Sequence, residues 1–354
     1  MDATVGSPQG SKGIIVTYGK IWPAHPKPCP DELLSSWIVR VAQANGIKLQ
    51  ALSWQLFGNA VSPWNRDIDR TAPSWLISAF SKHTGQPYWD LFHTTLATYR
   101  TRLYRHRRLS GQLAWILPVN NHGMNRQSYG QQFCPKCLSE GPFPYFRKHW
   151  RIALFTYCPV HQIALHDACP NCQAPVVHYR GDFGKNLEDA TPMNQCYLCG
   201  FDLATAKSEP VNFPSNELRC EFDQMLKSLL GPTSNTSKFD LSYFRVMHQL
   251  CRIMVSTAND GNLLDYLSEQ IKLKIPHVPP APIDVLRREE RHRLLLSVLW
   301  LMLDLKNRLC MAWQTKAVQY NTLTKDFAEQ PLWFSKIVRT CSSWRDRESR
   351  GHLY

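Results

Sequence analysis

Apolar residues between positions 33 and 42 recur three and four residues apart, which is the spacing of one face of a helix. Gly46 follows this run and marks the end of the predicted helix. The same spacing, interrupted by glycine or proline, predicts further helices over 49–57, 74–84 and 88–103. Short helices broken by single glycines favour a helix-turn-helix unit, and small helical bundles without a DNA role share this pattern.

Helical spacing returns after residue 215. It predicts helices over 216–230, 239–255 and 262–273, followed by a proline-rich connector at 276–282. The longest helix is expected to begin near Ile283, with an apolar stripe that forms either core or a partner surface. This part of the chain is therefore expected to be a helical domain.

Two sets of four metal-ligand residues lie between the helical parts. The first set pairs C-x-x-C with C-x-x-H across twenty residues, and the second pairs two C-x-x-C motifs across twenty-three. Two residues between ligands let one tight turn direct both donors at one ion, so each set predicts a closed tetrahedral zinc site. The ligands are Cys134, Cys137, Cys158 and His161 in the first set, and Cys169, Cys172, Cys196 and Cys199 in the second.

Clustered cysteines have two other common uses. A disulfide framework needs a secreted context, and the first ten residues contain no apolar stretch of the kind that an export signal carries. An iron–sulfur cluster would accept four cysteines, but the histidine in the first set favours zinc. His166 could replace His161, although His161 keeps the two-residue spacing. Four protein ligands leave no open position for water, so both zinc ions are expected to be structural.

The charge balance favours an anionic partner. Forty-one Lys and Arg against 28 Asp and Glu give a formal net charge of +13, which suits nucleic acid but also a soluble protein with a merely basic surface. The densest basic stretch, RTRLYRHRR from residue 100, is either a phosphate-binding segment or a solvated helix end. The predicted nucleic-acid contacts are Arg100, Arg102, Arg105, Arg107 and Arg108, and a continued helix would bring Arg100, Arg107 and Arg108 near one face.

Other features narrow the class of protein. Residues 144–151 interleave basic and aromatic side chains and could stack on bases, but they are better explained as the packed segment that returns the chain to zinc. The longest apolar run, 294–305, is shorter than a membrane span and contains an aspartate, so no transmembrane segment is expected. The cysteines outside the two sets are expected to be free thiols in a reducing cytoplasm, namely Cys29, Cys220, Cys251, Cys310 and Cys341.

No catalytic arrangement is evident in the sequence. A phosphate-binding loop of the G-x-x-x-x-G-K-[ST] type is missing, so nucleotide hydrolysis is not expected. Acidic residues are sparse and scattered, which leaves only a nuclease assembled from distant acids as an enzymatic alternative. The chain is therefore expected to act by binding.

Two blocks of sequence resemble the TniQ/TnsD proteins of bacterial transposons. The first is PCPDELLSSWIVRVA from residue 28, followed by Asn45-Gly46. The second is FCPKCL from residue 133, followed by Tyr145-Phe146-Arg147, Trp150-Arg151 and the ligand turns. The resemblance covers about residues 26 to 200 and is strongest to TniQ of CRISPR-associated transposons.

The resemblance implies target selection in transposition. TniQ proteins link a target-recognition element on target DNA to a AAA+ ATPase that recruits the transposase, and in CRISPR-associated transposons this element is Cascade with its guide RNA. TnsD relatives bind an attachment site directly and usually carry a longer C-terminal extension, so the length of this chain favours the adaptor. A bacterial, cytoplasmic and nucleoid-associated protein is implied, with a homodimer as one possible state.

These predictions define a mainly α-helical protein with small zinc-bound β elements. Its expected parts are an N-terminal arm over 1–25, a helix-turn-helix domain over 26–115, a double zinc-finger domain over 116–210 and a C-terminal helical domain over 211–354. Two structural Zn²⁺ ions are the expected cofactors.

Overall fold

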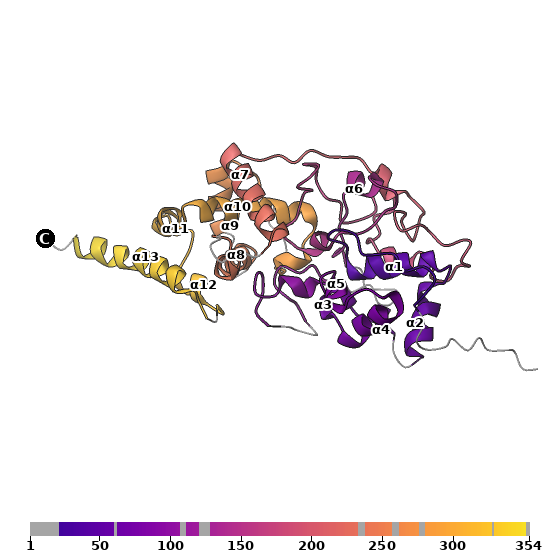
Figure 1. The fold of residues 1–354 in the computed structure, drawn as a ribbon. Helices are drawn as coiled ribbons and strands as arrows, with labels where there is room; N and C mark the ends of the chain where they lie inside the picture. The colour runs from indigo at the N-terminus through magenta and orange to yellow at the C-terminus, as the bar shows by residue number, and fades with distance from the viewer. Residues whose placement is uncertain are drawn as a thin grey trace, which may run out of the picture.

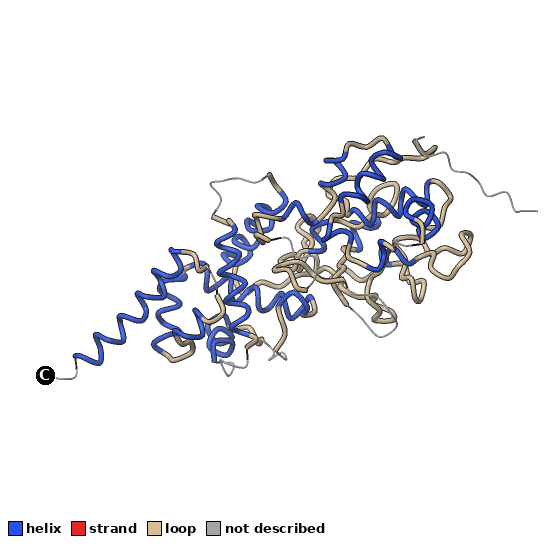
Figure 2. The backbone as a smooth tube through the Cα atoms, turned by 90° about the horizontal axis from the view of Figure 1, so that it is seen from below, coloured by secondary structure: helices blue, strands red, loops and turns tan. Residues whose placement is uncertain are grey.

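The computed structural model describes residues 21–59, 62–106, 111–119, 128–232, 238–256, 262–275, 280–327 and 329–351, with residues 342–351 described by their backbone alone. The predicted arm therefore lies almost entirely outside the described residues. Figure 1 shows one group of helices, α1 to α5, towards one end of the molecule and a second group, α7 to α13, towards the other. Figure 2 shows a loop-rich segment in the middle. The predicted mainly helical class is confirmed.

The first helical group is built around α1. Its helices are α1 Leu34–Ala44, α2 Leu49–Phe57, α3 Ile68–Thr71, α4 Ser74–Thr84 and α5 Tyr88–Phe92. Nine consecutive residues of α1 are buried, so this helix has almost no outer face. The turn to α2 passes through Gly46, whose φ of +62° suits glycine. The predicted ends of α1, α2 and α4 are confirmed.

The helix predicted over 88–103 is wrong, because it ends at Phe92 and gives way to a short 3₁₀ turn at Leu96–Tyr99. The hydroxyl groups of three threonines donate to nearby backbone carbonyls. These carbonyls are the acceptors that the backbone N–H groups of a continuing helix would need. Thr94 donates to Leu91 at 2.6 Å and Thr95 donates to Phe92 at 2.7 Å. The continued helix that was expected to align Arg100, Arg107 and Arg108 does not form, and Thr101 has a positive φ of 71°.

The middle segment contains short elements, namely α6 Pro135–Ser139 and 3₁₀ turns at Lys148–Arg151, His178–Arg180 and Leu203–Thr205. Within the part of the chain that the structure describes, β structure is limited to isolated bridges. Three of these bridges close the ligand turns: Tyr157 with Ala164, Ala168 with Pro175 and Gln195 with Asp202. They are the small β elements predicted beside the metal ligands. Phe146, Trp150 and Arg151 are buried, so the 144–151 segment packs inside the protein as expected.

The second helical group comprises α7 Asn216–Leu230, α8 Leu241–Met254, α9 Asn262–Ile271, α10 Arg288–Leu303, α11 Leu305–Gln314, α12 Tyr320–Thr324 and α13 Leu332–Gly351. α10 packs against α7, α8, α9 and α11 and is the central helix. The prediction that the longest helix begins near Ile283 is wrong. A 3₁₀ turn at Ile283–Val285 precedes α10, and α13 is longer at 20 residues against 16.

Polar contacts join the middle segment to the second helical group. Asp167 accepts two hydrogen bonds from the Arg287 guanidinium, both at 3.0 Å, and one from the Arg288 backbone at 2.7 Å. The Asp167 carboxylate therefore caps the N-terminus of α10, where negative charge is favoured by the helix dipole. Trp115 Nε1 donates to the Phe244 carbonyl of α8 at 3.0 Å. These contacts position the metal-ligand segment against the C-terminal helices.

Two of the predicted free thiols are paired. Cys310 of α11 and Cys341 of α13 form a disulfide with their Cα atoms 5.1 Å apart. The sequence did not reveal this pair because 31 residues separate the two cysteines, and only the packing of α11 against α13 brings them together. Cys29, Cys220 and Cys251 are free thiols as predicted. Across the described ranges, no helix combines the length and the apolar character that a membrane crossing requires.

Candidate metal centres and the basic stretch

Cys134, Cys137, Cys158 and His161 converge on one point. Their donor atoms lie within 4.8 Å of one another. His161 Nδ1 lies 3.5 Å from Cys134 Sγ, 3.3 Å from Cys137 Sγ and 3.5 Å from Cys158 Sγ. A tetrahedral zinc ion with Zn–S bonds of about 2.3 Å separates neighbouring sulfurs by about 3.8 Å, and the Sγ atoms of Cys137 and Cys158 are 3.6 Å apart. The donor set and its spacing fit zinc.

The second set is gathered in the same way. Cys169, Cys172, Cys196 and Cys199 place their Sγ atoms within 4.8 Å of one another. The pairs Cys169–Cys199 and Cys172–Cys196 are each 3.6 Å apart, which again matches the edge of a zinc tetrahedron. This centre lies nearer the surface, because Cys199 is exposed whereas Cys134 and Cys137 are buried.

Three of the four ligand turns share one backbone design. The fourth residue after the first cysteine donates its N–H back to the carbonyl of that cysteine and adopts a positive φ. These residues are Gln162 at 55°, Gln173 at 59° and Gly200 at 72°. The left-handed conformation reverses the chain just after the second ligand, so both donors of a turn face the same side. Two glutamines occupy a conformation that favours glycine, so the residue types at these positions do not predict this turn geometry.

Outer contacts hold the first centre in place. His161 Nε2 is 2.6 Å from Glu140 Oε1, so the carboxylate fixes the ring with Nδ1 towards the sulfurs. Although burial opposes it, the nearby thiolate of Cys137 raises the pKa of the Arg147 guanidinium. A zinc ion held by three thiolates and a neutral imidazole would carry one net negative charge, which the Arg147 guanidinium would offset. Sequence reasoning missed Glu140 and Arg147 because neither belongs to a ligand motif.

His166, the alternative to His161, does not join the centre. Its Nε2 lies 2.9 Å from the carbonyl oxygen of Lys207, and its ring stacks on Phe133 with centroids 5.1 Å apart. The Phe133 and His166 backbones also form a bridge with mutual hydrogen bonds of 2.9 Å. His166 therefore packs beside the first centre without supplying a donor to it.

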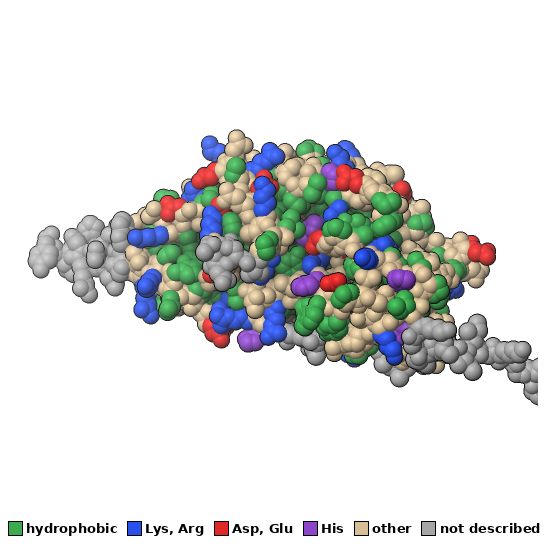
Figure 3. All heavy atoms as spheres, in the orientation of Figure 1, with side chains coloured by type: hydrophobic (Ala, Val, Ile, Leu, Met, Phe, Trp, Pro, Cys, Tyr) green, Lys and Arg blue, Asp and Glu red, His purple; other side chains and the backbone are tan. Residues whose placement is uncertain are grey.

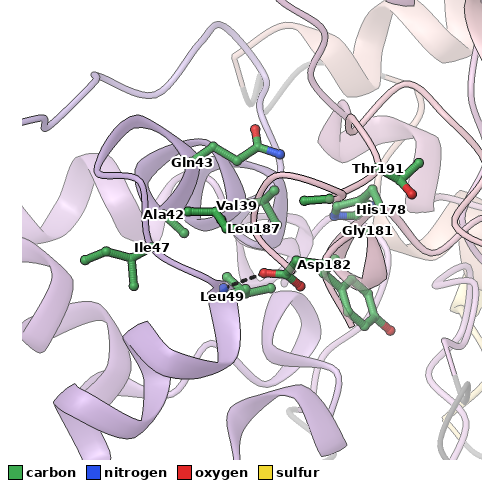
Figure 4. Close-up of a pocket in the computed structure, with 12 residues that line it drawn as sticks. Val39, Ala42, Gln43, Ile47, Leu49, His178, Gly181, Asp182, Leu187 and Thr191 are labelled. Carbon is green, nitrogen blue, oxygen red and sulfur yellow. Dashed lines mark hydrogen bonds between the residues drawn. The ribbon is translucent and has the colours of Figure 1, made fainter. Parts of the chain in front are cut away.

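The segment that joins the two ligand turns of the second centre packs against the N-terminal helices. Asp182 accepts a hydrogen bond of 2.6 Å from the Leu49 backbone and so caps α2. Figure 4 shows Val39 and Ala42 of α1 facing His178, Leu187 and Thr191 of this segment. The cavity between them is small, with a volume of about 30 Å³. This contact is a packed interface between two parts of the fold.

The five predicted nucleic-acid arginines have different surroundings. Arg102 donates to the carbonyls of Ser228, Leu229 and Gly231 and caps the C-terminal end of α7. Arg105 pairs with Glu329 at 2.7 Å, and Arg100 Nε donates to the Arg105 carbonyl at 3.2 Å. Arg107 and Arg108 lie outside the described residues. The structure thus brings Arg100 and Arg105 together and turns Arg102 towards the C-terminal helices.

This combination of a helical N-terminal part and two cysteine-rich centres defines a helical protein with tandem metal-ligand turns. Residues 23–165 match the family model described as TniQ, so this part of the chain is a TniQ segment. That match spans α1 to α5 and the whole first centre, and it ends before the second centre begins. The family acts in transposition, as the resemblance implied. No curated protein matches the chain.

Proposed function

We propose that the chain is a non-catalytic adaptor that links a target-recognition complex on DNA to the AAA+ ATPase that recruits the transposase. A CRISPR Cascade complex with its guide RNA is the proposed target-recognition partner. The observation that carries this proposal is the uncharged, aromatic outer face of the helix-turn-helix unit. The proposed location is the bacterial cytoplasm, on the nucleoid.

The outer face belongs to α2 and the start of α4. Because α1 is buried, α2 is the exposed helix of the pair, and none of its nine residues is charged. Trp54 is 58% exposed and Trp75 is 44% exposed. Phe57 meets the Trp75 ring edge-on at 4.8 Å. Exposed tryptophans without cations are typical of protein interfaces, whereas DNA recognition requires many phosphate contacts.

We assign a structural zinc ion to each cysteine-rich centre, with the eight predicted ligands. The four donors of each set leave no open coordination position, so the ions would hold the loop-rich segment together rather than activate water. A rigid metal-bound segment between two helical groups suits a protein that must present separate partner surfaces at a fixed spacing.

A TnsD-like protein that reads an attachment site directly is the second candidate. The basic stretch favours it, because Arg100 and Arg105 are exposed and could contact phosphates together with Arg107 and Arg108. Arg102 would then position the stretch from its seat on α7. Phosphate contacts alone confer no sequence specificity, so this stretch also fits an adaptor that rests on DNA.

Affinity purification of the tagged chain, after co-expression with the neighbouring genes, tests the two candidates. Recovery of Cascade subunits with guide RNA is expected for the adaptor, and recovery of the ATPase on a fixed DNA site without RNA would select the direct reader. Trp54→Ala with Trp75→Ala should lose a protein partner. Trp89→Ala, which removes a tryptophan from α5 that is 65% exposed, is the matched control. Recovery of neither partner would contradict both candidates.

A further inference from the structure

Glu329 joins the two helical groups at the surface. Its carboxylate lies 2.7 Å from the Arg105 guanidinium of the TniQ segment and 3.8 Å from the Arg245 guanidinium of α8. Glu329 is in the loop between α12 and α13, so three separate parts of the chain meet at this carboxylate. Arg105 and Arg245 are therefore held side by side across the boundary of the TniQ match.

Further cations continue this surface in both directions. Arg252 of α8 lies 3.6 Å from Asp326 and donates to the Lys325 carbonyl. Gln249 donates to the same carbonyl at 3.2 Å, which fixes the loop against α8. We call the surface that these contacts link the seam surface. Its cationic residues are Arg100, Arg105, Arg245, Arg252 and Lys325, of which Lys325 is joined to the others through its backbone carbonyl. Figure 3 shows Lys and Arg side chains gathered along the lower edge of the molecule beneath α8 and α12.

The seam surface has an excess of positive charge that is accessible to solvent. Five cations face two carboxylates, Asp326 and Glu329, which leaves three net positive charges. Three of the pairing side chains are open, with Arg105 at 54%, Arg252 at 41% and Glu329 at 62% exposure, whereas Arg245 is 21% exposed and lies over the Phe327 ring. Ion pairs this exposed contribute little to stability, so their arginines can exchange a carboxylate for another anion at little cost.

We infer that the seam surface binds the phosphodiester backbone of duplex DNA, and that Glu329 competes with the phosphates for Arg105 and Arg245. This inference rests on the proposed function and gives its DNA contact a place. It extends the contact from the basic stretch onto the C-terminal helices, where sequence analysis predicted no nucleic-acid contact. Arginine presents a planar fork of donors that suits phosphate oxygens, and each contact releases condensed counterions from the DNA.

The competition predicts opposite effects from two kinds of variant. Glu329→Gln removes the internal anion, so duplex affinity should rise and its salt dependence should steepen by about 1 in the slope of log K against log salt. Arg245→Gln with Arg252→Gln removes two contacts, so the slope should fall by about 2. The control is Lys272→Gln with Lys306→Gln, which removes the same charge from two exposed positions elsewhere. Lys272 directly follows α9 and Lys306 lies on α11, so this variant should leave the slope close to that of the wild type.

The measurement is fluorescence anisotropy of a labelled duplex of arbitrary sequence, titrated with the full chain at several salt concentrations. Thermal unfolding and metal content establish that each variant is folded, and Arg100→Gln with Lys325→Gln replaces the α8 pair if that pair unfolds. An unchanged affinity for Glu329→Gln, or an equal loss in the lysine control, would overturn the inference.

A single-stranded RNA of the same length is the second probe. Tighter binding of RNA through the same five residues would overturn the duplex assignment and make the guide RNA backbone the ligand. Failure of this inference is distinguishable from failure of the proposed function. If only this inference fails, the seam-surface variants bind DNA normally, and the ATPase and the target-recognition complex are still recovered with the tagged chain.

Discussion

Glu140 and His161 form a 2.6 Å contact that fixes the imidazole from the side opposite the three sulfurs. Glu140 follows the first pair of ligands and lies directly after α6, whereas His161 is the second ligand of the second pair. The contact therefore ties the two halves of the first centre together outside the set of donors.

Removing this carboxylate should weaken metal binding at the first centre alone. Glu140→Ala leaves His161 free to turn, and loss of such an outer partner typically costs 10- to 100-fold in metal affinity. Competition with a chromophoric chelator would measure the loss. Asn171→Ala is the matched control at the second centre, where the Asn171 amide donates to Cys199 Sγ at 3.6 Å. Equal metal affinity in Glu140→Ala and the wild type would contradict this role.

Ligand substitutions should remove one ion each. The two sets follow one another along the chain without interleaving, so Cys134→Ala and Cys169→Ala should each reduce the zinc content from two ions per chain to one. Structural zinc contributes on the order of 10 kcal/mol to the folding of small modules, so the affected segment should also become sensitive to proteolysis. Mass spectrometry under non-denaturing conditions would count the ions. Loss of both ions from either variant would show that the two centres fold as one unit.

The Arg102 cap should contribute measurably to stability. Three carbonyls at the end of α7 accept from one guanidinium, and Arg102→Ala leaves them without this partner. We expect a loss of about 1–3 kcal/mol in the free energy of unfolding, read from denaturant titration. Arg105→Ala removes only the exposed pair with Glu329 and should change stability by less than about 1 kcal/mol. A larger loss for Arg105→Ala than for Arg102→Ala would reverse this ranking.

Stability should fall in mild acid because of His292. Burial lowers the pKa of this histidine to about 4, and its ring stacks on Phe222. The unfolded chain takes up the proton near pH 6.5, whereas the folded protein resists it, so stability is complete above that pH and declines towards pH 4. The loss at pH 5 should be about 2 kcal/mol. His292→Gln should reduce the difference in unfolding free energy between pH 7 and pH 5. An unchanged difference would exclude His292 as the cause.

Local patterns predicted most of the helices, and the ligand spacing picked out two sets of residues whose donor atoms the structure gathers. The bounds of α2, α4 and α7 followed from apolar spacing and from the glycines that end them, since these signals lie within the helix itself. The helix over 88–103 was overpredicted, because threonine hydroxyls competed for backbone carbonyls in a way that apolar spacing does not register.

Long-range partners could not be predicted in the same way. The Cys310–Cys341 disulfide, the seat of Arg102 on α7 and the bridging position of Glu329 all join residues that are far apart in the sequence. Each depends on how helices pack, and one sequence contains no direct record of that packing. Glu140 was closer to its partner but lay outside the spacing rule that identified the ligands.

Arg102 anchors the basic stretch to the end of α7. The Arg102 guanidinium contacts the end of α7, while Arg100 and Arg105, on either side of it in the sequence, belong to the seam surface. α7 in turn packs against α10, the central helix of the second group. The basic stretch of the TniQ segment is therefore connected, through Arg102 and α7, to the helix at the centre of the second helical group.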